Sequence, residues 1–96
     1  MRASVALGQH REEIRRIVAS QRAKNPRVFG SVLTGEDQDG SDLDILVDPT
    51  PETSIFDIGE IRYQLRELLG VPVDVLTPNA LHAGLREHVL SEAMPV

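Results

Sequence analysis

Apolar residues in the first quarter of the chain recur at the spacing of a helix with one buried side. Asn25-Pro26 follows this stretch, and the residue before a proline is disfavoured in the helical region. The pattern therefore predicts a helix over residues 7–23. The apolar positions on its predicted inner side are Leu7, Ile14, Ile17 and Val18.

Two short runs typical of β-strands flank a polar, glycine-rich stretch. Val28-Phe29 leads into Gly30. In the run 43–47, which ends at Asp48-Pro49, every residue except Asp44 is aliphatic or β-branched. The sequence predicts a strand, an acidic loop and a second strand.

A second amphipathic helix is predicted after Ser54, because Asp57 stands three places on and completes the pattern of a capping box. Gly70 is expected to end this helix, and the run 71–76 is predicted to be a third strand. A final helical segment is expected after Thr77-Pro78-Asn79. The apolar stripes of the two helices are Ile58, Ile61, Leu65 and Leu68, and then Leu81, Leu85, Val89 and Ala93.

The predicted order of elements is helix, strand, loop, strand, helix, strand, helix. Strands interleaved with helices indicate an α/β (α+β) fold, in which helices pack against a small mixed sheet of three or slightly more strands. A length of 96 residues predicts a single domain, 1–96, without room for a second domain that would hold a substrate.

Composition excludes several classes of protein. The sequence is 41% hydrophobic and 26% charged, and no apolar run approaches the roughly 20 residues that would cross a bilayer, so no membrane association is expected. The first ten residues do not resemble a secretion signal. The absence of cysteine excludes disulfides and thiolate metal sites. We therefore expect a cytoplasmic protein.

Charge is unevenly distributed along the chain. Residues 1–27 contain seven Lys and Arg against two Glu, a net charge of +5, whereas the remainder carries −10 and the whole chain −5. Because the body is acidic, direct binding to nucleic acid is not expected. The basic start is either a solvated helix face or a contact for an acidic partner.

The aspartates of the second and third predicted strands have the spacing of a shared site. Asp42 and Asp44 are two residues apart, so on a strand they would point to one face, about 6.6 Å apart. If the third strand lies beside the second, Asp74 can reach the same face.

Three such carboxylates would repel one another strongly. At an effective dielectric constant near 20 the ionised trio would cost about 8 kcal/mol, which is comparable to the whole stability of a small domain. A divalent cation such as Mg²⁺ or Mn²⁺ would offset that cost. Two alternatives stay open: one Asp is protonated, or Asp42 caps a turn while Asp44 and Asp74 bind loop atoms.

Gly30-Ser31 could supply the complementary half of the site. Glycine lets the backbone approach a ligand, successive N–H groups in a turn bind anions, and the serine hydroxyl adds a donor. Such a dipeptide alone is more often an ordinary turn. Here it is followed by ten residues and then by Asp-x-Asp.

This arrangement resembles the signature of the polymerase-beta-type nucleotidyltransferase superfamily, with Asp74 at its third acidic position. The phrase from Ser41 to Val47 and the segment from Leu85 to Ala93 are similar to the minimal nucleotidyltransferases of bacteria and archaea. The resemblance covers about residues 10–95.

The resemblance implies roles for the site residues. Asp42 and Asp44 would hold two Mg²⁺ ions, and Asp74 would complete one metal site and help deprotonate an acceptor hydroxyl. Gly30 and Ser31 would bind the phosphates of ATP, and Ser41 is also expected to contact the nucleotide. Family members commonly carry an Arg after the Gly-Ser pair, where this chain has Val-Leu-Thr at 32–34, and this difference weakens the expected binding of the triphosphate.

The minimal family is similar to antitoxins that pair with HEPN-domain toxins, which are helical ribonucleases. The leading hypothesis is that this protein transfers AMP from ATP to a hydroxyl, expected to be a tyrosine, of such a toxin and so neutralises it. Two alternatives are an antitoxin or assembly subunit that acts by binding alone, and a nucleotidyltransferase for small molecules. Both homo- and hetero-oligomers are compatible with the sequence.

The three histidines, His10, His82 and His88, lack the spacing of a metal site. We expect all three to be surface or interface residues.

Overall fold

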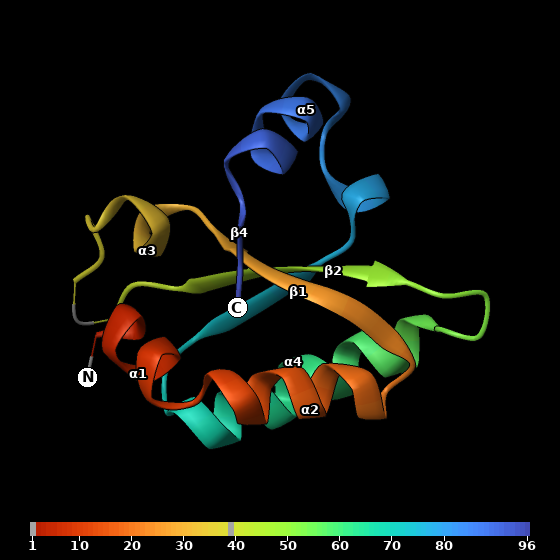
Figure 1. Ribbon diagram of the computed structural model, residues 1–96, viewed down its shortest axis with the longest axis horizontal. Coiled ribbons are helices and arrows are strands. Elements are labelled where there is room, and N and C mark those ends of the chain that lie inside the picture. The colour runs from red at the N-terminus through yellow and green to blue at the C-terminus, as the bar shows by residue number, and fades with distance from the viewer. Residues whose placement is uncertain (1, 39) are drawn as a thin grey trace.

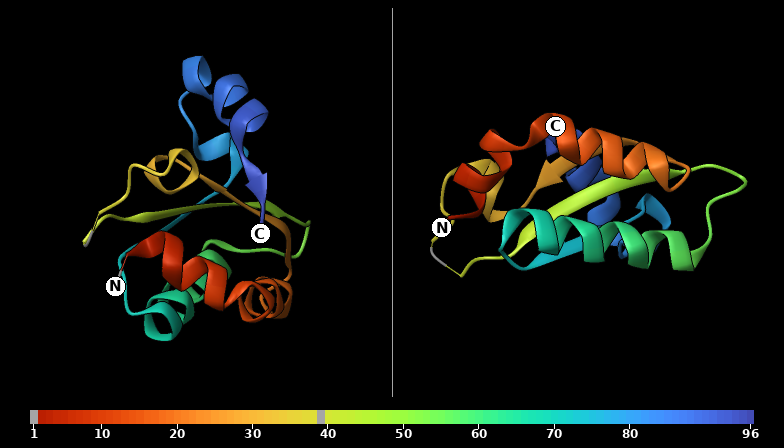
Figure 2. Two further views of the ribbon diagram at one scale, coloured as in Figure 1. Left: turned by 60° about the vertical axis from the view of Figure 1, so that its left-hand side comes forward. Right: turned by 90° about the horizontal axis from the view of Figure 1, so that it is seen from below.

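A four-stranded sheet separates two groups of helices in the computed structural model, which describes residues 2–38 and 40–96 (Figure 1). Helices α1, α2 and α4 cover one face of the sheet, whereas α5 stands over the other, and the second orientation shows the same two layers (Figure 2). The elements are α1 (Ala3–Gln9), α2 (Arg11–Ser20), β1 (Ala23–Phe29), α3 (Ser31–Thr34), β2 (Leu43–Pro49), α4 (Ile55–Leu69), β3 (Val73–Leu76), the 3-10 helix η1 (Pro78–Ala80), α5 (Ala83–Glu92) and β4 (Met94–Pro95).

The sheet has the strand order β3-β2-β1-β4. β1 is antiparallel to both β2 and β4, while β2 and β3 are parallel. The small mixed sheet expected from the sequence is thus confirmed, and the strand that the sequence pattern did not indicate is the two-residue β4.

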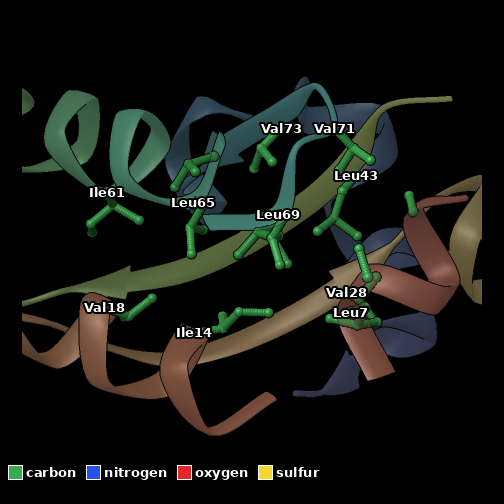
Figure 3. Packing of buried hydrophobic residues seen from close by; sticks show 14 of the residues in the cluster. Leu7, Ile14, Val18, Val28, Leu43, Ile61, Leu65, Leu69, Val71 and Val73 are labelled. Atoms are coloured by element: carbon green, nitrogen blue, oxygen red, sulfur yellow. The ribbon is translucent and has the colours of Figure 1, made fainter. Parts of the chain in front are cut away.

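The hydrophobic core lies between the sheet and the helices α1, α2 and α4 (Figure 3). Alternate residues of β2 point into it, because successive side chains of a strand face opposite sides. Leu46 is fully buried on the other face, where η1 contacts β2. The central core residues shown in Figure 3 include Ile14, Val18, Leu43, Ile61, Leu65 and Val73.

The single helix predicted over residues 7–23 is wrong. Two helices occupy this region, with a break at His10, whose ring nitrogen lies 2.7 Å from the carboxylate of Glu13. The second helix ends at Ser20, before the predicted stop, because Arg22 adopts a left-handed φ of 64° and turns the chain into β1. Pro26 lies inside β1, where the register shifts and a proline is tolerated.

The helix predicted after Ser54 is confirmed, including its reciprocal capping box with Asp57 and its end at Gly70. The last helical segment is also confirmed, as η1 followed by α5. No residue of α5 is buried, and Arg86 holds this helix to η1 through hydrogen bonds to the carbonyls of Pro78 and Leu81 (2.8 and 3.2 Å). Among residues 2–38 and 40–96, no helix combines the length and apolarity needed to traverse a bilayer.

Candidate functional site

Asp44 and Asp74 are direct neighbours on the parallel strands β2 and β3. Adjacent strands lie about 4.8 Å apart, and paired residues point to the same face. This confirms that the third predicted strand lies beside the second. The face in question is the one opposite the main core, and both aspartates are partly exposed there.

The environment of Asp44 disfavours its charged form. Burial raises the pKa of the Asp44 carboxyl, and repulsion by Asp74 and then by Asp42 raises it further. Asp42 is exposed and lies just before β2, not within it. Asp44 is thus the aspartate on which the neighbouring carboxylates act.

Arg66 of α4 lies beside the third aspartate. Its Nη2 atom is 3.9 Å from Oδ1 of Asp74, and its Nε donates a hydrogen bond to the carbonyl of Val73 at 3.1 Å. In the sequence, Arg66 is equally compatible with a phosphate or partner contact and with a solvated helix face, because a charged residue on an amphipathic helix gives no sign of which strand it reaches.

Gly30 brings the two halves of the site into contact. It follows Phe29, which pairs with Asp44 across the antiparallel strands, and it has a φ of 82°. A Cβ atom at this position would lie 2.5 Å from Oδ2 of Asp44. Only glycine therefore lets the turn pass so close to the carboxylate.

The two serines of the predicted phosphate site, Ser31 and Ser41, lie in different surroundings. Ser31 is partly buried at the start of α3, directly after Gly30. The hydroxyl of Ser41 accepts a hydrogen bond from the backbone N–H of Gln38 at 2.9 Å. Ser41 thus shapes the loop, and its nucleotide-binding role stays a prediction.

The loop between the two halves is anchored by Asp37, which is 1% exposed. Its carboxylate accepts a hydrogen bond from the backbone N–H of Ser4 at 3.0 Å, and Arg2 donates to its carbonyl. The hydrogen bond from Ser4, together with the Arg2 charge, holds the pKa of Asp37 below its usual range. In the sequence this residue was indistinguishable from the exposed acidic residues around it.

A cavity of about 380 Å³ lies between α3 and α5. Its polar lining comes from Ser31, Thr34 and Glu36 on one side and from His88 and Glu92 on the other. His88 is exposed, as expected, but it also faces this cavity, which only the placement of α5 reveals.

A sequence model of the nucleotidyltransferase domain family matches residues 7–96. The chain belongs to this family. A candidate protein adenylyltransferase of Methanocaldococcus jannaschii, MJ0435, is 39% identical over 80 residues, which cover 83% of this chain and 86% of that protein. Protein adenylyltransferase MntA of Thermococcus cleftensis is 39% identical over 69 residues, which cover 72% and 70% of the two chains.

Solved structures agree with this nucleotidyltransferase fold. A structure described as a candidate minimal nucleotidyltransferase shares 39% identity at a TM-score of 0.87, over 97% of this chain and 95% of that one. A chain of a toxin–antitoxin complex with AMP-PNP has a TM-score of 0.70 at 17% identity, over 97% and 71% of the two chains, and this similarity shows the fold alone.

The donors that the candidate site offers are carboxylate oxygens, which suit Mg²⁺. Asp44 and Asp74 are in register, and the pKa of Asp44 is raised, as expected where a cation would relieve repulsion. Within residues 2–38 and 40–96, however, no three acidic or histidine side chains are gathered closely enough to form a metal site. Asp74 is 3.9 Å from Arg66, and Asp42 is exposed before β2. A site formed by all three aspartates stays a prediction.

Proposed function

We propose that this nucleotidyltransferase is a protein adenylyltransferase that acts as an antitoxin. It transfers AMP from ATP to a hydroxyl, expected to be a tyrosine, of a partner HEPN-domain toxin and so neutralises that toxin in the cytoplasm. The observation that carries the proposal is the pairing of Asp44 with Asp74, together with the close approach of Gly30 to Asp44. The names of the similar proteins, which are protein adenylyltransferases, support the choice of reaction.

In this proposal each residue has a part in the transfer. Asp42, Asp44 and Asp74 would hold Mg²⁺, which supplies charge neutralisation to the attacking and leaving oxygens when bound. Asp74, which is half exposed, would accept the proton of the acceptor hydroxyl. The backbone of Gly30 and the hydroxyl of Ser31 would orient the phosphates.

The reaction forms one bond and breaks one. The acceptor oxygen bonds to the α-phosphorus of ATP, and the bond from that phosphorus to the bridging oxygen breaks, so that pyrophosphate leaves. The acceptor proton passes to the carboxylate of Asp74 and then to solvent.

The test is an in vitro transfer assay with the small helical protein encoded by the neighbouring gene. With ATP and Mg²⁺, the intact mass of that partner should increase by one AMP unit. Asp42→Asn and Asp44→Asn should abolish the gain while the fold is retained. Asp48→Asn is a matched control, since Asp48 lies on the same face of β2 but is engaged by Arg27 and Asn25. Unchanged transfer by Asp44→Asn would disprove the assigned site.

A second function, neutralisation by binding alone, is favoured by one observation. Among the described residues, the cavity beside Gly30 and Ser31 is lined by no lysine or arginine, and Thr34 stands where family members commonly have an arginine. If Asp42→Asn still silences the partner in cells, binding suffices. If silencing is lost together with transfer, catalysis is required.

A further inference from the structure

One long side of α4 is exposed next to the open edge of the sheet. β3 is the outermost strand, and within residues 2–38 and 40–96 no strand pairs with its free side. Arg66 of α4 reaches this edge, where its Nε donates to the carbonyl of Val73 at 3.1 Å. Residues 55, 59 and 62 share its side of the helix, because they recur at steps of three or four, whereas α2 packs beside α4 elsewhere (Figure 2). We refer to this side as the α4 flank, which consists of Ile55, Phe56, Gly59, Arg62, Tyr63 and Arg66.

The apolar side chains of the α4 flank are unusually exposed. Ile55 is 81% exposed, Phe56 82% and Tyr63 59%. A cavity of about 330 Å³ at the start of α4 is lined by Ile55 and Ile58 and, beyond β3, by Thr77. Single exposed apolar residues are ordinary, but three along one helix beside an apolar cavity mark a surface that a partner covers.

The α4 flank is basic, although it lies on an acidic body. Residues 28–96 carry a net charge of −10, yet the flank holds Arg62 and Arg66 and no carboxylate. By helical spacing, the acidic side chains of α4, which are Asp57, Glu60 and Glu67, point away from β3. A partner with carboxylates therefore fits the flank, whereas a second copy of this chain would bring four arginines together.

We propose that the α4 flank docks the protein that supplies the acceptor hydroxyl, through a segment with carboxylates opposite the two arginines and apolar side chains over Ile55 and Phe56. This inference rests on the proposed function, in which Asp74 accepts the proton of that hydroxyl. Arg66 links the flank to the site, because its Nη2 atom lies 3.9 Å from Oδ1 of Asp74. A segment bound along the flank ends beside this carboxylate, so docking brings the acceptor to it.

Calorimetric titration of the full chain with the small helical protein encoded by the neighbouring gene, without ATP, measures docking by itself. Phe56→Ser should weaken binding about ten- to thirtyfold, the range of an aromatic residue that anchors an interface. Arg62→Glu should weaken binding about tenfold at low salt, and by less as salt is raised. Since neither residue belongs to the candidate site, both variants should bind Mg²⁺-ATP like the wild-type protein.

Matched controls come from other surfaces of the protein. Leu85→Ser removes an exposed apolar side chain from α5, and Arg16→Glu reverses an exposed charge on α2, and both variants should bind the partner like the wild-type protein. The chain contains no cysteine, so a benzophenone label can be attached at a single introduced position. The label on Tyr63→Cys should crosslink to the partner near its modified hydroxyl, whereas the label on Leu85→Cys should not.

Several results would overturn the docking surface while leaving the proposed reaction intact. These are partner binding that Phe56→Ser and Arg62→Glu do not alter, equal losses in the two control variants, and no crosslink from position 63. A dimer of the chain alone that Phe56→Ser dissociates would assign the flank to a second copy and overturn the proposal as well. Weaker binding by both flank variants, with no AMP transfer by the wild-type protein, would support the docking surface and count against the proposed reaction alone. A wild-type protein that does not bind the partner would overturn both.

Discussion

Replacing Asp44 by asparagine should stabilise the metal-free protein, whereas most substitutions of partly buried residues destabilise. Asp44 and Asp74 are paired on strands about 4.8 Å apart. Two unit charges at that distance repel by roughly 3.5 kcal/mol at an effective dielectric constant of 20. Since the side chain of Asp74 is 48% exposed, solvent screening reduces this to about 1 kcal/mol.

The expected gain depends on pH. Because the pKa of Asp44 is raised by burial, Asp74 and Asp42, the folded state binds a proton more tightly than the unfolded state. The wild-type protein should therefore lose stability as pH rises from the ordinary aspartate value of 3.8 through the raised folded value. Asp44→Asn does not lose stability in this pH range. At neutral pH its Tm should therefore be about 4–8 °C higher than that of the wild-type protein.

Thermal unfolding in the presence of a chelator measures this difference. Asp48→Asn is the matched control from the same face of β2, since Asp48 accepts hydrogen bonds from Arg27 at 2.6 Å and from Asn25 at 3.0 Å. Its replacement should cost about 1–3 kcal/mol, the opposite sign. Mg²⁺ should then raise the Tm of the wild-type protein more than that of Asp44→Asn. A loss of stability in Asp44→Asn similar to that in Asp48→Asn would refute the repulsion.

Three further substitutions test the surrounding structure. Gly30→Ala should lower the free energy of unfolding by about 1–3 kcal/mol in denaturant, because Gly30 has a positive φ and an added Cβ would clash with Asp44. The control Gly59→Ala should stabilise the protein, since Gly59 lies in helical backbone with open space around it, and equal effects of the two substitutions would contradict the strain at Gly30. Asp37→Asn should lower the free energy of unfolding at neutral pH, because the pKa of Asp37 is lowered in the folded protein. The difference in stability between wild type and Asp37→Asn should shrink as pH falls through that lowered pKa, and a difference that does not change with pH would show that the charge of Asp37 does not stabilise the fold. Arg66→Ala should lower the free energy of unfolding by about 1 kcal/mol, because the hydrogen bond to Val73 and the ion pair with Asp74 are lost. It should also strengthen the response of Tm to Mg²⁺, and an unchanged response would show that Arg66 does not compete with Mg²⁺ for the Asp74 carboxylate.

Short-range sequence patterns were sufficient to predict the helix α4 and the strand β2. The helix α4 follows from a capping box and a glycine end, and both depend on residues within a few positions of each other. The strand β2 follows from its apolar run. The division of residues 3–20 into α1 and α2 was missed, because the apolar spacing continues across the break at His10.

For the candidate site, too, the sequence predicted some features and only the tertiary structure decided others. The sequence alone predicted the Gly30-Ser31 turn and the aspartates as the candidate chemical groups, because few other roles explain a carboxylate inside an apolar strand. The tertiary structure decided their contacts: the register that pairs Asp44 with Asp74, and the approach of Gly30 to Asp44. It also brought Arg66 to Asp74 and placed α5 over the Gly30-Ser31 turn, with His88 in the intervening cavity. These contacts join residues far apart in the chain, so they depend on strand pairing and helix packing, which no local pattern encodes.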